Sequence, residues 1–375
     1  MMPFSVPRVR RCALTEPKAC DVSFVSHQGH VSDNSDSVRL SDHTTFRVGG
    51  PAARFIRATT QEQLMDEVRR ADDNQVPLLL LGGGSNILAS DDGFDGTVIQ
   101  VSTRGITAEV SSCGGAVVRV QAGENWDEFV GFAVSQGWVG VETLSGIPGS
   151  VGATPIQNVG AYGMDVAATI SSVRTLDRST GMIRTFPAVD CEFGYRTSIF
   201  KRNQGRWCIL DVSFQFPLGD LSTAIAYPEL ARALGVDVGE RAGTQHVREA
   251  VLGIRRSKGM VLDEADHDTW SGGSFFTNPL LTPEEAATLP PEAPRFPAGD
   301  RIKTSAAWLI QHAGFPRGHG NDLASLSTKH VLALTNRGRA GATDLVDLAR
   351  EVREGVSARY GIVLEPEVNI LGNAL

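Results

Sequence analysis

The sequence predicts an α+β protein built from two or three domains. The chain has 375 residues, which exceeds the usual length of a single domain. Segments typical of strands and of helices follow one another without the strict alternation of a parallel α/β fold. The composition changes near residues 217–220, which we take as a candidate domain boundary, and a proline-rich stretch follows at residues 290–297.

Short apolar runs and helical periodicity define the expected elements. We expect strands at residues 54–58, 77–81, 97–101, 117–122, 172–177, 182–186, 207–216 and 362–371. We expect helices at residues 61–70, 125–137, 244–256, 305–312 and 343–360. Thr60 with Gln63, and Asn125 with Glu128, have the spacing of helix N-terminal caps. Residues 1–38 show no periodicity, so we expect a disordered extension there.

Composition and charge exclude several classes of protein. The formal net charge is −8, with 35 basic and 43 acidic residues, so nucleic acid is not an expected partner. The five cysteines form no C-x-x-C pair, which argues against a disulfide framework or a zinc site. No apolar run is long enough to span a bilayer, and no signal peptide is evident. We therefore expect a cytoplasmic protein without a metal or membrane insertion, and a monomer.

Two glycine-rich loops suggest a site for a diphosphate. Residues 82–86, Gly-Gly-Gly-Ser-Asn, directly follow a buried strand, and glycine allows the backbone to approach an anion closely. A triple glycine alone is equally consistent with a tight turn. However, residues 145–163 form a second loop of nearly twenty residues, and long loops inside compact domains are usually functional. Because neither loop matches a Rossmann or P-loop fingerprint, we expect the diphosphate to lie between them.

Three segments in this order resemble the FAD-binding region of the UDP-N-acetylenolpyruvoylglucosamine reductase family: Thr44–Gly50, Gly82–Asn86 and Ile147–Gly163. The resemblance extends from about residue 44 to residue 372. It implies the two-subdomain FAD-binding fold of the vanillyl-alcohol-oxidase (PCMH-type) superfamily, followed by an α+β substrate-binding domain. The implied boundaries are 39–105 and 106–218 for the subdomains, 219–360 for the substrate-binding domain, and 361–375 for a C-terminal strand that returns to the active site.

The resemblance also implies two redox partners, FAD and NADPH. Residues 82–90 contain no His or Cys that could attach a flavin, so the FAD is expected to be non-covalent. The implied FAD-binding residues are Gly82, Gly83, Gly84, Ser85, Asn86, Ile147, Pro148, Gly149, Ser150, Gly152, Ala153, Gln157, Asn158, Gly160, Ala161 and Tyr162.

Three polar side chains are candidates for catalysis. Arg196 offers a rigid fork of donors suited to a carboxylate, although an arginine after Tyr195 is also typical of surface stacking. Ser274 is a poor acid unless it protonates a strongly basic carbon. Glu365 and Glu367 are two apart on an expected strand and would share a face. The resemblance implies catalytic roles for Arg196, Ser274 and Glu367, and leaves Glu365 structural.

The same resemblance implies a binding site for the diphosphate of a UDP-sugar. In relatives of the longer, tyrosine-bearing type the contacts correspond to Tyr227, Lys258 and Asn278. A basic residue at the end of a helix also compensates the helix dipole, so Lys258 has an alternative role. Some relatives carry a basic residue where Thr277 stands. Lys329 and His330 lie in a matching segment, but the sequence assigns them no role.

The implied reaction reduces the enolpyruvyl group of UDP-N-acetylglucosamine enolpyruvate to UDP-N-acetylmuramate, in peptidoglycan precursor synthesis. NADPH reduces FAD, flavin N5 passes hydride to C3 of the vinyl ether, and Ser274 protonates C2. Arg196 and Glu367 stabilise the charge that accumulates towards the carboxylate. An alcohol or lactone oxidase of the same superfamily, and a flavin-binding module without turnover, are the alternatives.

Overall fold

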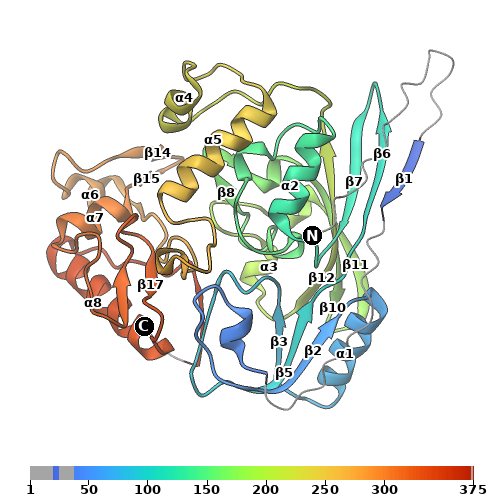
Figure 1. The fold of residues 1–375 in the computed structure, drawn as a ribbon, viewed down its shortest axis with the longest axis horizontal. Coiled ribbons are helices and arrows are strands. Elements are labelled where there is room, and N and C mark those ends of the chain that lie inside the picture. The colour runs from blue at the N-terminus through green and yellow to red at the C-terminus, as the bar shows by residue number, and fades with distance from the viewer. Residues whose placement is uncertain (1–19, 25–37, 373–374) are drawn as a thin grey trace.

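The computed structural model describes residues 20–24, 38–372 and 375, and its helices and strands form an α+β architecture, as predicted (Figure 1). Within the predicted disordered extension, Cys20–Phe24 form strand β1, which pairs antiparallel with β6 (Ile106–Ser111). The prediction of disorder is therefore wrong for these five residues. Val38, the last residue of the predicted extension, is also described, and its carbonyl accepts a hydrogen bond from the Ala52 N–H at 3.0 Å. Residues 1–19 and 25–37 lie outside the described residues.

The first part of the chain forms a small parallel sheet of strand order β2-β5-β3, with helix α1 (Gln61–Asp73) packed on it. Its strands are β2 (Ala52–Ala58), β3 (Leu78–Leu81) and β5 (Phe94–Val101). The predicted cap is confirmed, because the Thr60 side chain accepts a hydrogen bond from the Gln63 N–H. The Gln63 side chain returns to the N–H of Thr59, one residue before the cap.

A six-stranded antiparallel sheet, β1-β6-β7-β12-β10-β11, forms the second part. The strands not yet given are β7 (Gly115–Gln121), β10 (Ile170–Asp177), β11 (Met182–Pro187) and β12 (Trp207–Phe216). The predicted hairpin joins β10 to β11. Helix α2 (Trp126–Ser135) brings Trp126 and Phe129 into the same core as Phe214 and Phe216 of β12. Burial of these rings on one face fixes the sheet beneath the second glycine loop.

The third part is mainly helical, and it occupies the left side of Figure 1. Its helices are α4 (Pro228–Leu234), α5 (Thr244–Ser257), α6 (Pro283–Ala287), α7 (Ala306–His312) and α8 (Ala342–Tyr360). Its short strands are β13 (Leu280–Leu281), β14 (Phe296–Ala298), β15 (Arg301–Lys303), β16 (Ala324–Leu326) and β17 (Leu334–Asn336). The predicted apolar face of α8 is buried, and Gly361 ends the helix at φ +69°.

The C-terminal segment differs from its prediction. Only β18 (Asn369–Leu371) is a strand, and it pairs in parallel with β4 (Ile87–Ala89), next to the first glycine loop. The prediction that Glu365 and Glu367 share a face is wrong. The Glu365 side chain is 71% exposed and that of Glu367 is 13% exposed. The physical reason is that residues 362–368 form no regular strand, so the alternation of side chains is not maintained.

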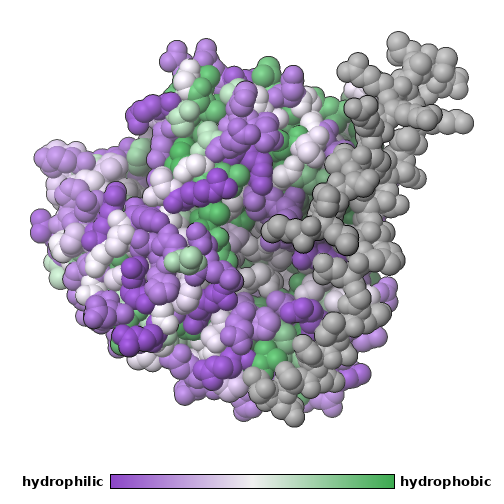
Figure 2. Space-filling view, viewed as in Figure 1, coloured by the Kyte–Doolittle hydropathy of each residue, from purple (hydrophilic) through white to green (hydrophobic). Residues whose placement is uncertain are grey.

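The face of the molecule seen in Figure 2 is largely hydrophilic, with small separate hydrophobic patches. In the described part of the chain, no helix is long and apolar enough to cross a membrane. Cys113, Cys191 and Cys208 are free thiols. Burial raises the pKa of Cys191 and of Cys208 to about 12, so neither is a reactive thiolate at neutral pH.

Candidate active site

A cavity of about 300 Å³ lies where the two glycine loops meet the third part of the chain. Arg196, Ser274 and Glu367 all line it, although they come from three distant segments of the sequence. The loop residues Gly82 to Asn86 form part of the same wall. The structure therefore brings the three predicted catalytic residues to one site beside the predicted cofactor loops.

The two glycine loops touch through their backbones. A Cβ atom on Gly83 would lie 2.8 Å from the Cα of Gly149, and one on Gly84 would lie 1.8 Å from the His43 carbonyl oxygen. The Ser85 hydroxyl donates to the Pro148 carbonyl at 3.0 Å. Only glycine allows this close contact, which leaves a wall of backbone facing the cavity. Backbone dipoles and small hydroxyls on such a wall suit a diphosphate, so these residues fit FAD.

Most of the predicted FAD-binding residues line the cavity: Gly82, Gly83, Gly84, Ser85, Asn86, Ile147, Pro148, Ser150, Ala153, Gln157 and Gly160. The others do not line it: Gly149, Gly152, Asn158, Ala161 and Tyr162. Gly149 supports Gly83, and the Asn158 amide donates to the Gly194 carbonyl at 3.1 Å. Their predicted contacts with FAD remain predictions.

The Arg196 guanidinium is held by an acid and two carbonyls. Its Nε lies 2.9 Å from Oε1 of Glu367, and its Nη1 and Nη2 donate to the carbonyls of Asn158 and Gly160 at 3.4 and 2.8 Å. Its Cζ is also 5.7 Å from the ring centroid of Tyr195, so the stacking expected for a surface arginine is present as well. Because the ion pair with Glu367 and two hydrogen bonds to carbonyls orient the planar fork, its direction is fixed before any ligand binds.

Ser274 and Glu367 are brought together by backbone hydrogen bonds. The N–H of Glu367 donates to the Phe275 carbonyl at 2.7 Å, and the N–H of Thr277 donates to the Glu365 carbonyl at 3.0 Å. Phe275 is itself fixed from the other side, since its N–H donates to the Leu332 carbonyl at 2.8 Å. The residue before Phe275 is Ser274, which therefore lies at the same end of this pairing as Glu367.

Glu367 is nearly enclosed by polar partners. Burial raises the pKa of its carboxyl above the ordinary value, and the positive charges of Arg196 and Lys201 oppose that effect. The Gln157 amide donates to Glu367 Oε1 at 3.4 Å, and the Asn86 amide donates to both Gln157 Oε1 and the Glu367 carbonyl. The acid is thus tied directly to both cofactor loops.

Comparisons with known proteins agree with this geometry. A family model described as "FAD binding domain" matches residues 52–186, and one described as "UDP-N-acetylenolpyruvoylglucosamine reductase, C-terminal domain" matches residues 264–371. A UDP-N-acetylenolpyruvoylglucosamine reductase from Cutibacterium acnes is 56% identical over 341 residues, which cover 90% of each chain. The chain belongs to the UDP-N-acetylenolpyruvoylglucosamine reductase family.

Other relatives give the same result. A reductase of this name from Thermobifida fusca is 51% identical over 350 residues, which cover 90% of this chain and 98% of the relative. The crystal structure of the enzyme from Thermus caldophilus shares the fold at a TM-score of 0.60 and 23% identity, covering 91% of this chain and all of the other. The chain is accordingly an FAD-binding oxidoreductase with the predicted α+β fold, and the oxidase alternative is not favoured.

Two cationic residues that line the reductase cavity were not among the predicted site residues. Lys201 and Arg255 both line the cavity, and Arg255 is 9% exposed. The Arg255 Nη2 donates to the Met260 carbonyl at 2.9 Å, whereas its Nε has no hydrogen-bond partner among the described residues. Lys201 stands five residues after the predicted Arg196, and Arg255 stands three residues before the predicted Lys258. Only the basic character of these segments could have indicated them.

The predicted substrate residues lie in two places. Asn278 lines a second cavity that shares Arg196 and Lys201 with the first. Lys258 and Tyr227 line neither cavity; Lys258 Nζ pairs with Glu229 at 2.5 Å, and Tyr227 is 46% exposed. The geometry thus places Asn278 on a cavity wall shared with Arg196, and it leaves Lys258 and Tyr227 at the end of α5 and the start of α4.

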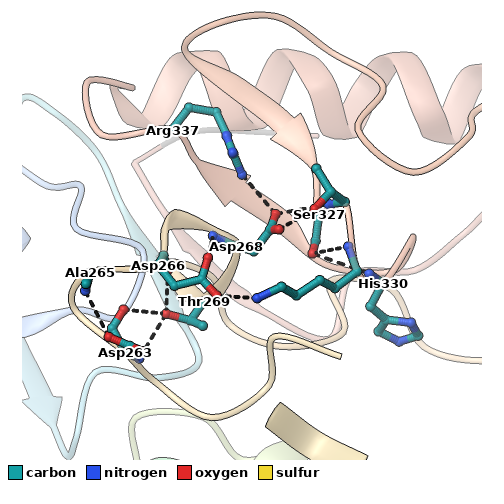
Figure 3. A network of polar contacts seen from close by, with 10 residues as sticks. Asp263, Ala265, Asp266, Asp268, Thr269, Ser327, His330 and Arg337 are labelled. Carbon is teal, nitrogen blue, oxygen red and sulfur yellow. Dashed lines mark hydrogen bonds and ion pairs between the residues drawn. The ribbon is translucent and has the colours of Figure 1, made fainter. Parts of the chain in front are cut away.

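A polar network fixes the loop that precedes Ser274 (Figure 3). Asp268, which is buried, accepts hydrogen bonds from the Thr328 N–H at 3.0 Å and the Arg337 Nη1 at 2.9 Å, and also from the Thr328 hydroxyl. Lys329 pairs with Asp266, which gives this unassigned lysine a structural role. Burial is the main cause that lowers the pKa of His330 to about 4, and the positive charge of Lys258 is the next. The imidazole is therefore neutral at pH 7.

We expect Asp268→Asn to lower the free energy of unfolding by about 2 kcal/mol, because hydrogen bonds to a buried charged group are lost. Burial alone would raise the pKa of Asp268, but its bonds with Thr328 and Arg337 hold the pKa below the ordinary value. This stabilisation is therefore present above the unfolded pKa and is lost as the pH falls through the folded one. Urea unfolding at pH 7 and at pH 2, well below the ordinary aspartate pKa of 3.8, measures both effects.

Asp266→Asn is the matched control for this prediction. In the Asp266–Lys329 pair the side chains are 32% and 36% exposed, respectively. Exposed ion pairs contribute about 0–1 kcal/mol to the free energy of unfolding. An equal loss of stability in the two variants would contradict the role given to Asp268.

Proposed function

We propose that this chain catalyses the NADPH-dependent reduction of the enolpyruvyl group of UDP-N-acetylglucosamine enolpyruvate to UDP-N-acetylmuramate. We further propose that it does so as a cytoplasmic monomer in peptidoglycan precursor synthesis. The observation that carries the proposal is the meeting of Arg196, Ser274 and Glu367 on the wall of one cavity, next to the loops that fit FAD.

The three side chains have complementary tasks. When bound, FAD supplies the hydride that it accepts from NADPH. The Arg196 fork binds the carboxylate of the enolpyruvyl group and stabilises the negative charge that grows on it. Glu367, at 2.9 Å from Arg196 Nε, keeps the guanidinium in place. Ser274 donates the proton that C2 of the olefin takes up, after C3 has received the hydride, so the double bond is fully reduced.

Cations near the cavity support a doubly charged phosphate ligand despite the net negative charge of the chain. Arg255 lines the cavity wall, and Lys258 lies three residues later at the end of α5. We assign Tyr227, Lys258 and Asn278 to the diphosphate of the nucleotide. For Lys258 this assignment requires that it exchange Glu229 for the phosphate, because the two side chains are paired here.

An anaerobic titration of the purified flavoprotein tests the proposal. We expect NADPH to bleach the flavin absorbance, and stoichiometric UDP-N-acetylglucosamine enolpyruvate to restore it, with UDP-N-acetylmuramate as the product. Bleaching by a simple alcohol, followed by recovery with oxygen alone, would instead support an oxidase. Flavin that NADPH does not bleach would support a binding module without turnover.

A further inference from the structure

Arg196 has a backbone conformation that is unfavourable for arginine. It lies in the turn from Gly194 to Thr197, whose end residues exchange backbone hydrogen bonds of 3.0 and 3.3 Å. Its φ is +52°, in the left-handed region, where the Cβ atom of any residue except glycine is crowded. Such positions persist only where the surrounding structure holds them, and they are common at active sites.

Lys201 holds this residue from the helix that follows the turn. Its Nζ donates to the Arg196 carbonyl at 3.1 Å. Lys201 belongs to α3 (Ile199–Arg202), whose first residues are capped by the Ser198 side chain. The Ser198 hydroxyl also donates to the Ile156 carbonyl at 2.5 Å, and this bond ties the start of α3 to the second glycine loop. The lysine is therefore placed over the strained turn by a short, anchored helix.

Lys201 also adds positive charge at the catalytic acid. It lines the first cavity with Glu367, and it lines the second cavity as well. Burial raises the pKa of Glu367, and the charge of Lys201 acts against this, after that of Arg196. Burial lowers the pKa of Lys201 itself, and Glu367 opposes that effect. The two side chains thus stabilise one another's charged forms.

The other charged groups around this pair come from separate elements. Asp165 of β9 (Met164–Asp165) faces Arg196 and Lys303, since both cations act on its pKa. Lys303 Nζ lies 5.1 Å from the ring centroid of Tyr195. Neither Asp165 nor Lys303 contributes to the pKa of Glu367, so Lys201 and Arg196 are the cations that set its charge.

We propose that Lys201 is a positioning residue for reduction of the enolpyruvyl group. It holds Arg196 in the left-handed conformation that directs the guanidinium to Glu367 and the cavity, and it keeps Glu367 charged. The proposal rests on the proposed function, because it concerns the step in which Arg196 binds the enolpyruvyl carboxylate. It makes Lys201 necessary for the second half-reaction, and not for reduction of the flavin by NADPH.

Lys201→Met removes the ammonium and keeps the length of the side chain. We expect flavin reduction by NADPH to stay within about twofold of wild type, whereas reoxidation by the enolpyruvyl nucleotide slows about ten- to hundredfold, as expected for a misplaced catalytic group. The acid limb of the reoxidation rate should move to higher pH, because Glu367 then holds its proton more tightly. Lys201→Arg, which keeps the charge, should restore most of the rate.

Lys201→Gln separates the two tasks, because its amide can donate to the Arg196 carbonyl but carries no charge. Amide hydrogen exchange of residues 194–198, measured with FAD bound and no substrate, reports the turn directly. We expect exchange about tenfold faster in Lys201→Met and unchanged in Lys201→Gln. The acid limb should shift in both variants.

Arg202→Met is the matched control, since it removes the same charge from the next residue of α3. Arg202 pairs at the surface with Glu192 and donates to the Thr197 hydroxyl at 3.3 Å, and neither contact involves the backbone hydrogen bonds of the turn. Arg202→Met should leave exchange and both half-reactions within about twofold of wild type. Wild-type exchange in Lys201→Met together with an unmoved acid limb would overturn the proposal. If the wild-type enzyme itself is not reoxidised by the nucleotide, the proposed function fails. The exchange result still tests whether Lys201 holds the turn at residues 194–197.

Discussion

Ser274→Ala is expected to accept electrons from NADPH at the normal rate and to lose the second half-reaction. General acid catalysis typically contributes about 10²–10⁴-fold, so reoxidation of the reduced flavin by the enolpyruvyl nucleotide should slow by that factor. The backbone around residue 274 should not change, because the hydrogen bonds of Phe275 to Leu332 and Glu367 involve no Ser274 atom. Anaerobic rapid mixing, with each half-reaction followed by flavin absorbance, measures the two rates separately.

Ser271→Ala is the matched control for Ser274→Ala. Ser271 lies on the same cavity wall, but its hydroxyl accepts a hydrogen bond from the Gly273 N–H at 3.1 Å and is 4% exposed as a residue. We expect it to lower stability by about 1 kcal/mol and to change reoxidation much less than Ser274→Ala does. Normal reoxidation in Ser274→Ala, or a larger loss in Ser271→Ala, would refute the assignment of the proton donor.

Local patterns predicted longer elements such as α1, α2, α5, α8 and β12, but not β6, α3, α4 or α6. The strand Trp207–Phe216 follows from a run of β-branched and apolar residues. The hairpin before it follows from two such runs on either side of a Ser-Thr-Gly turn. The apolar face of the last helix follows from its period of 3.6 residues. Each of these signals lies within one segment, so the sequence carries it in full.

The errors arose where partners are distant. Residues 362–368 were expected to continue a strand, but they bridge the third part of the chain and β4, with Pro366 opposite Phe276 in a single isolated bridge. The assignment of Lys258 to the diphosphate came from the resemblance and stays a prediction. Its pairing with Glu229 depends on how α4 packs on α5, so no local pattern indicated that pair. Whether a residue such as Lys258 finds an ion-pair partner depends on tertiary contacts, which a local pattern does not contain.

In the candidate site, too, some features follow from a local pattern and others depend on distant contacts. The glycine loops could be recognised because glycine at residues 82–84 has few alternatives, given the contacts that a Cβ atom would make there. Lys201 could not be recognised, because its role depends on the left-handed backbone of Arg196 and on a hydrogen bond that closes only when α3 forms. The family resemblance selected Glu367 over Glu365, and the exposure of the two side chains now supplies a physical reason.

Glu367→Gln is expected to slow reoxidation of the flavin by about 10²–10³-fold, as removal of one preorganised electrostatic group typically does. The amide keeps the shape of the side chain but not the charge that lies 2.9 Å from Arg196 Nε. Burial raises the pKa of Glu367, so in the wild type the carboxylate gains a proton as the pH falls through a value above the ordinary glutamate range. Below that pH the ion pair with Arg196 is lost and the rate should fall.

The pH profile therefore distinguishes the ion pair from a merely structural acid. Glu367→Gln has no proton to gain, so its reoxidation rate should be low and flat where the wild-type rate falls. Glu365→Gln, two residues earlier and 71% exposed, should keep both the wild-type rate and the wild-type acid limb. Retention of the acid limb in Glu367→Gln would show that another group titrates there.

A double variant tests whether Arg196 and Glu367 act as one unit. Groups that act together show strongly non-additive losses, because removing either one already removes their joint effect. We therefore expect Arg196→Met combined with Glu367→Gln to slow reoxidation about as much as the worse of the two single changes. Losses that multiply would mean that the two side chains contribute separately, and the ion pair would then have no part in orienting the guanidinium towards the substrate carboxylate.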